Sequence, residues 1–387
     1  MKEDIGKKKR IEWLDGIKWL ACLMVFFSHF YGFFYGKCDV KPEVHSALAT
    51  FLGTGYNIFI NGNFWMCMFC VISGYFAYKK EIKSLKELIV AFVKRYLRFF
   101  LPFLCVNSLA LLISRTIGFQ NGVYSAMLPN SWVGEYYNFT VTPWIVLRAS
   151  LKLSSELDCP LWMIYPLFIG TCFIYVCKYL QTKIKPTYIN GCMVAVWMIV
   201  WIVPSFHEKY LYSMVTVIGC FLELIWEKKW FVVSQSLLHV IALAFVFVMI
   251  GGLQSDALVY LEQWILVPEG TLNVCNGIYA MIMLVTIGNA PAIQKLLSVP
   301  MIRKGKELSF AVYVLHWLVL SAFSLPVYGK LVNEGMNITA VFGTNLVLTT
   351  ILLLLLSFIY HETVERVVTV ILNKIRICGE TIGIHQQ

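Results

Sequence analysis

The chain has 387 residues, of which 59% are hydrophobic and only 14% are charged, and its formal net charge is +10. Soluble domains carry about 25% charged residues, so this composition excludes a water-soluble globular protein. It equally excludes disordered, collagen-like and disulfide-rich secreted chains. We therefore predict an all-α membrane protein whose main partner is the lipid bilayer. The basic charge is explained by membrane topology and needs no nucleic acid as a partner.

Ten apolar stretches are long enough to cross about 30 Å of hydrocarbon, and only helices fit these lengths. The first follows a basic segment that resembles a signal peptide only superficially, because no small-residue cleavage site follows it. We predict a bundle of about ten transmembrane helices at Ile17–Tyr35, Tyr56–Tyr78, Leu97–Ser114, Leu161–Lys178, Ile189–Phe206, Tyr210–Trp226, Trp230–Gly252, Thr271–Asn289, Ser309–Val327 and Thr339–Tyr360.

The distribution of Lys and Arg predicts the orientation of the chain. An even number of spans places both termini on one side, and 25 of the 32 basic residues fall on that side against 7 on the other. By the positive-inside rule this side is cytoplasmic, in a multi-pass protein of the cell membrane. The predicted organisation is a basic cytoplasmic N-terminus at 1–16, a membrane domain at 17–366 and a cytoplasmic tail at 367–387.

The longest segment between predicted spans covers residues 115–160 on the outer face and is rich in aromatic residues. Long ordered loops are often functional, so it is a candidate cover for an outward-facing acceptor site; the alternative is an interfacial aromatic belt. Cys67 and Cys70 are interpreted as small packing residues within the second span. Cys38 and Cys159 both lie on the outer side, and the sequence leaves their pairing open.

Ionisable residues inside spans are functional candidates, because their burial in lipid is costly. Lys18 and His29 are eleven residues apart, which places them within about 20° on one helical face and about 16 Å apart along the axis. This spacing predicts a cation at the cytoplasmic rim and an imidazole deep in the same span. Imidazole suits a general base; the alternative is a core histidine bonded to a neighbouring helix.

A second candidate is the pair Arg95 and Arg98 at the cytoplasmic end of the third span, followed by Pro102. Residues three apart share a helical face, and two guanidiniums at this spacing can grip a pyrophosphate. The alternative is ordinary anchoring of a cytoplasmic helix end.

A third candidate is the face formed by Ser309, Tyr313 and His316, which are spaced by four and three residues. We interpret His316 as lining the same cavity as His29 or orienting it, and a packing hydrogen bond is the alternative. His361 and Glu365, four residues apart at the end of the last span, are also placed to pair.

In their order along the chain, these segments resemble the acyltransferase-3 family of integral-membrane O-acyltransferases. The resemblance runs from about Arg10 to Arg366. It rests on six motifs: Leu14–Lys18 with His29, Val71–Phe76, Arg95–Arg98 with Pro102, Pro160–Trp162, Ser309–His316, and Glu365 with Arg366.

The resemblance implies an enzyme that transfers an acyl group, acetyl by family analogy, from cytoplasmic acyl-CoA to a carbohydrate hydroxyl at the cell surface or on a lipid carrier. It implies that His29 is the catalytic base, by direct transfer or through an acyl-histidine. Acyl-CoA is then a co-substrate, and we expect neither a permanently bound cofactor nor a metal. The implied ligands of the CoA phosphates are Lys18, Arg95 and Arg98, and the implied supporting residues are Asp15, Trp162, Ser309, Tyr313, His316 and Glu365.

The sequence departs from the family pattern at two places. Lys18 stands where the family usually has Arg, and Trp162 is followed by Met163 without the downstream glutamate of many polysaccharide-modifying members. Two other functions are compatible with the same residues. One is a transporter or flippase for a glycan or small anion, which the lack of an inverted repeat disfavours; the other is an inactive relative.

Overall fold

The computed structural model describes residues 11–34, 61–124, 131–228, 236–268 and 270–384, and all regular elements in these ranges are helices. The element η3 is a 3-10 helix, and η4, η5 and η6 are π-helical turns. In chain order the elements are α1 Glu12–Phe34, α3 Gly62–Tyr78, α4 Leu85–Thr116, α5 Asn121–Tyr124, α6 Ser131–Glu135, α7 Pro143–Lys152, η3 Cys159–Met163, α8 Ile164–Leu180, α9 Pro186–Ile202, α10 Pro204–Lys228, α11 Ser236–Val248, η4 Met249–Leu253, α12 Gln254–Glu262, α13 Thr271–Gly288, α14 Pro291–Leu297, α15 Pro300–Val319, η5 Leu320–Ser324, α16 Leu325–Asn333, α17 Ile338–Tyr360, η6 His361–Glu365 and α18 Arg366–Ile384.

The prediction of a helical, multi-pass membrane protein is confirmed. In the described residues helices lie within each of the ten predicted places, although the predicted span Ile189–Phe206 is divided between α9 and α10, and six helical stretches are long and apolar enough to cross a membrane. The prediction of ten crossings is not confirmed, because three further apolar helices are shorter and α3 has only 17 residues. The cytoplasmic N-terminus stays a prediction. The six stretches are Glu12–Phe34, Leu85–Thr116, Cys159–Leu180, Thr271–Gly288, Pro300–Asn333 and Ile338–Ile375.

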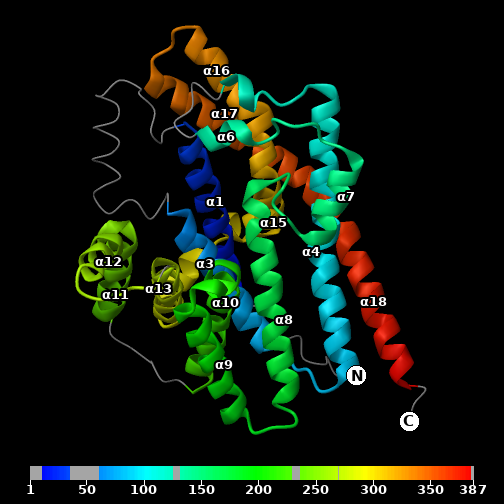
Figure 1. Cartoon of the computed structure of the whole chain (residues 1–387), viewed down its shortest axis with the longest axis vertical. Coiled ribbons are helices and arrows are strands. Elements are labelled where there is room, and N and C mark those ends of the chain that lie inside the picture. The colour runs from blue at the N-terminus through cyan, green and yellow to red at the C-terminus, as the bar shows by residue number, and fades with distance from the viewer. Residues whose placement is uncertain (1–10, 35–60, 125–130, 229–235, 269, 385–387) are drawn as a thin grey trace.

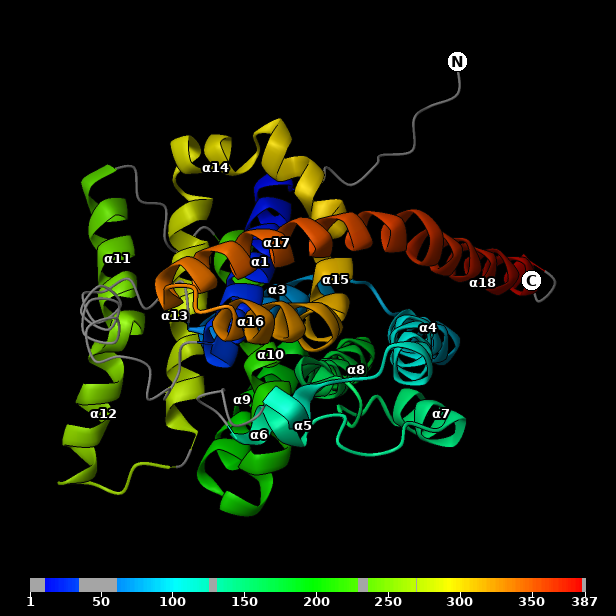
Figure 2. The same ribbon diagram turned by 90° about the horizontal axis from the view of Figure 1, so that it is seen from above.

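Helices α1, α3 and α15, which carry several of the predicted functional residues, lie at the centre of the bundle (Figure 2). Helix α1 packs against α15 and α3, and α3 packs against α10, α13 and α8. Seen from above, α4 with α7 and the pair α11–α12 lie on opposite flanks, while α18 projects away from the bundle (Figure 2). Figure 1 shows α4 and α8 running side by side through much of the bundle, and these two helices are in contact.

Helices α3 and α10 cross closely because glycines face each other at the crossing. A Cβ atom on Gly74 would overlap the carbonyl oxygen of Thr216, and one on Gly219 would overlap the carbonyl oxygen of Val71. Small residues allow such backbone contact in membrane bundles, where apolar burial adds little to helix association. The Ile-Ser-Gly motif of α3 therefore has a packing role at Gly74.

The segment after α4 folds back along that helix instead of standing clear of the bundle. The Arg115 side chain donates to the carbonyl of Val141 at 3.5 Å, and Asn107 Nδ2 donates to Ser150 Oγ at 3.0 Å. Helix α7 thus lies antiparallel beside α4 (Figure 1). Cys38 lies outside the described residues, so its predicted relation to Cys159 is untested.

Candidate functional site

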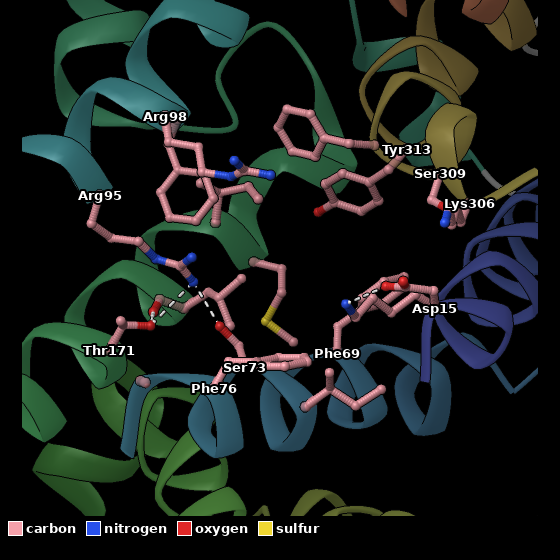
Figure 3. A pocket seen from close by; sticks show the side chains of 18 of the residues that line it. Asp15, Phe69, Ser73, Phe76, Arg95, Arg98, Thr171, Lys306, Ser309 and Tyr313 are labelled. Carbon is pink, nitrogen blue, oxygen red and sulfur yellow. Dashed lines mark hydrogen bonds and ion pairs between the residues drawn. The ribbon is translucent and has the colours of Figure 1, made fainter. Parts of the chain in front are cut away.

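The two arginines of α4 are held differently. The Arg95 guanidinium donates from Nη2 to Ser73 Oγ at 2.6 Å and to Thr171 Oγ1 at 3.2 Å, and it lies 4.6 Å from the centre of the Phe99 ring. These contacts tie α4 to α3 and α8. Arg98, one turn further along α4, is exposed and points into a cavity that Arg95 also lines (Figure 3).

Lys18 of α1 lines the same cavity as the two arginines, next to Phe76 of α3. Its Nζ is 3.1 Å from Asp15 Oδ1, and it sits 4.6 Å from the centre of the Phe76 ring. Asp15 itself is buried. The pair neutralises the buried carboxylate, and the aromatic ring provides a further favourable contact for the cation.

The cavity that these residues line has a volume of about 630 Å³. Arg95 and Arg98 from α4 face Asp15 from α1 and Lys306 and Tyr313 from α15 (Figure 3). Cations outnumber carboxylates among the described lining residues, so the cavity favours an anionic ligand. We name it the cation-lined cavity. Its ionisable lining residues include Asp15, Lys18, Arg95, Arg98, Lys306, Glu307, His361 and Glu365.

The two predicted intramembrane histidines meet. His316 Nε2 lies 3.1 Å from His29 Nδ1, and the other ring nitrogen of His316 lies 2.7 Å from the Tyr313 carbonyl and 3.2 Å from the Val312 carbonyl. Carbonyl oxygens only accept, so Nδ1 of a neutral His316 carries the hydrogen and its Nε2 accepts. His29 Nδ1–H is then the donor, which leaves His29 Nε2 unprotonated and able to act as a base.

His29 lines a second, smaller cavity of about 280 Å³, which we name the histidine cavity. Met66 lines both cavities, and Tyr313 of the cation-lined cavity donates from Oη to the carbonyl of Pro160, which lines the histidine cavity. The two cavities therefore lie back to back with a thin wall between them. The histidine cavity is lined by Ser28, His29, Asn61, Gly62, Asn63, Met66, Pro160 and Trp162.

The structure brings most of the predicted site residues to these two cavities. Ser309 lines the cation-lined cavity and donates to the carbonyl of Gly305 at 3.5 Å, whereas Tyr313 is committed to Pro160. The predicted pairing of His361 with Glu365 is confirmed, at 3.0 Å. This pair lies in the π-helical turn η6, and such turns are often found at functional sites.

Sequence reasoning missed several residues of the site. Lys306 was visible only as one more cytoplasmic cation, although it extends the Ser309 face by three residues. The sequence did not indicate Thr171, because a threonine hydroxyl in an apolar span most often donates a hydrogen bond to a backbone carbonyl of its own helix. The sequence did not indicate Met66 either, since its position between two cavities depends on how helices distant in sequence pack.

The fold and the site define a helical membrane protein with a cation-lined cavity backed by a histidine pair. The chain matches the family model described as an acyltransferase domain over residues 11–361. It therefore belongs to the acyltransferase-3 family and is a membrane acyltransferase. Comparison with curated proteins and with solved structures gave no match.

Proposed function

We propose that this acyltransferase moves an acyl group, acetyl in the first instance, from acyl-CoA to a carbohydrate hydroxyl, with His29 as the base. The observation that carries the proposal is the hydrogen-bond arrangement at His316. It places the hydrogen of a neutral His29 on Nδ1 and leaves the lone pair on Nε2, in a side chain that lines the histidine cavity, back to back with the cation-lined cavity. Because the proposed base and the proposed polyanion site lie in adjacent cavities, the acceptor and the donor can enter the protein separately.

The donor occupies the cation-lined cavity. Arg98, Lys18 and Lys306 contact the phosphates of CoA, and Arg95 both contacts them and fixes the wall between α3, α4 and α8. The cavity has apolar side chains beyond the cations, including Phe69 and Met66, and these line the path of the pantetheine arm toward the wall. The thioester reaches His29 by displacing Met66.

The acceptor hydroxyl occupies the histidine cavity. His29 Nε2 takes its proton while the oxygen attacks the thioester carbonyl carbon. The carbon–sulfur bond then breaks, and the imidazolium returns the proton to the CoA thiolate. Neither an added oxidant nor an added proton is needed. His316 holds the reacting ring through His29 Nδ1 and stabilises the imidazolium as a neutral acceptor.

The test uses membranes containing wild-type or His29→Gln protein with acetyl-CoA labelled in the acetyl group. We expect the wild type to release CoA and to place label in lipid or glycan, and the variant to lose at least about 100-fold of this rate. Label trapped on the protein would indicate an acyl-histidine. Equal turnover in both proteins would remove His29 from its role.

The same assay, repeated with purified protein, separates acyl transfer from transport. A transporter or flippase would leave acetyl-CoA intact, with or without a gradient, whereas an acyltransferase consumes it in purified form without one. Failure of wild-type protein to bind or consume acetyl-CoA and longer acyl-CoA thioesters would contradict the proposed donor.

A further inference from the structure

A third hollow adjoins the histidine cavity on the flank of the bundle. It has a volume of about 550 Å³ and lies between α4, the end of α7 and the start of α8. Trp162 lines both this hollow and the histidine cavity. We name it the lateral groove; its lining residues are Tyr96, Leu151–Ser155, Trp162, Tyr165 and Phe168.

The groove lies at membrane depth. Asn107, which bonds to Ser150 of α7, is nine residues from Thr116 at the end of α4, or about 14 Å along the axis. Tyr96 Oη, deeper still on α4, donates to the carbonyl of Leu151 at 2.9 Å. The C-terminal end of α7 and the turn that follows it therefore lie beside the part of α4 between Asn107 and Tyr96, within the stretch Leu85–Thr116 that is long and apolar enough to cross a membrane.

Exposed apolar side chains border the groove at Leu151 and Tyr165 and continue along α7 to Leu147 and Trp144. Trp144, Leu147 and Leu151 on α7 are exposed by 66%, 41% and 49%, and Tyr165 on α8 is exposed by 42%. In a membrane-spanning bundle, large apolar side chains on such a surface face lipid. The groove therefore opens sideways toward the bilayer.

Polar side chains line the groove at the same depth, among mostly apolar and aromatic neighbours. Lys152, Ser154 and Ser155 line it beside the aromatic side chains, and Lys152 is exposed. Irregular backbone and polar side chains within a membrane are stable where they line a cavity that holds water or a polar ligand. Aromatic rings next to hydroxyl groups can bind a sugar ring, by stacking on its apolar face and by hydrogen bonds to its hydroxyls. The Lys152 ammonium can bind an anionic linkage such as a phosphate.

We propose that the lateral groove admits a lipid-linked carbohydrate from the bilayer and delivers its hydroxyl to His29 past Trp162. This inference rests on the proposed function and narrows its acceptor to a sugar on a lipid carrier. The sugar passes Trp162 into the histidine cavity, the linkage lies near Lys152, and the lipid tail stays against Leu147 and Leu151. A soluble polymer reaching His29 from the aqueous face would not use this groove.

The first test fills the groove. In Ser155→Trp we expect transfer of labelled acetyl to the native membrane acceptor to fall at least about 10-fold, with stabilisation of the protein by acetyl-CoA unchanged. Ser108→Trp is the matched control, because Ser108 is an exposed serine of α4 outside the groove. Tyr165→Leu, with the exposed Tyr188→Leu on α9 as its control, repeats the test without adding bulk.

The second test identifies the carrier. We expect the labelled product to extract into chloroform–methanol, and dodecyl β-D-glucoside to inhibit transfer at a concentration at least about 10-fold below that of methyl β-D-glucoside. Ser155→Trp should abolish this difference. Label confined to an aqueous polymer, or equal inhibition by both glucosides, would overturn the lateral route while leaving acyl transfer intact. Absence of any acetyl-CoA turnover in the wild type would instead contradict the proposed function.

Discussion

His316 Nε2 accepts a hydrogen bond from His29 Nδ1 across 3.1 Å, joining α15 to α1 at the centre of the bundle. The direction of this bond follows from the two backbone carbonyls that face His316 Nδ1. In the proposed mechanism His316 is a positioning residue, since it touches His29, the proposed base, and does not line the histidine cavity.

The first prediction concerns His316. In His316→Leu the acceptor for His29 Nδ1–H is lost, so we expect kcat to fall about 100-fold while KM for acetyl-CoA changes less than about twofold. His316→Gln keeps an acceptor oxygen and should recover part of the rate. His239→Leu, a buried histidine of α11 away from both cavities, is the control for loss of a buried imidazole. A parallel rise in KM would mean that His316 acts on the donor.

The second prediction separates the two arginines of α4. Arg95→Lys loses the planar fork that reaches both Ser73 and Thr171, so we expect the free energy of unfolding to fall by about 1–2 kcal/mol and acetyl-CoA affinity to fall about 10-fold. Arg98→Lys, which lacks those helix contacts, should lower affinity without lowering thermal stability. The measurements are thermal unfolding in detergent and titration with acetyl-CoA. Equal loss of stability in both variants would contradict the different roles.

The third prediction concerns the contact of α3 with α10. Gly74→Ala places a methyl group against the Thr216 carbonyl, so we expect a loss of about 1–3 kcal/mol in the free energy of unfolding. Gly191→Ala, at a helical glycine of α9 with open space around it, should be neutral or should stabilise the protein by about 0.5–1 kcal/mol. Unfolding of both variants in the same detergent checks the difference. Equal stability would mean that the helices separate at little cost.

The sequence predicted those parts of the fold and site that depend on local spacing. The apolar runs fixed where helices form, and the intervals between Lys18 and His29 and between Ser309 and His316 placed these residues on shared faces. Apart from the expected proximity of His316 to His29, contacts between distant segments could not be predicted. Neither the return of α7 along α4 nor the wall formed by Met66 and Pro160 has a sequence signal, because both depend on how helices pack in three dimensions.

The fourth prediction concerns Lys306, which spacing alone did not identify. Its ammonium lines the wall of the cation-lined cavity that faces Arg95 and Arg98 (Figure 3). We expect Lys306→Met to raise KM for acetyl-CoA about 3- to 10-fold and to weaken the dependence of KM on ionic strength, because one phosphate contact is lost. Lys295→Met, an exposed lysine of α14 outside the cavity, is the matched control.

The fifth prediction concerns the wall between the cavities. Met66 is buried and contacts both, and its unbranched thioether side chain can move aside more easily than a branched or aromatic one. In Met66→Phe we expect acetyl-CoA to bind with unchanged affinity while transfer falls at least about 10-fold, because the thioester no longer reaches His29. Met66→Leu conserves volume and should cost less. If Met66→Phe transfers acetyl at the wild-type rate, the thioester does not pass at Met66. It then passes where Tyr313 bonds to the Pro160 carbonyl, and that hydrogen bond has to break.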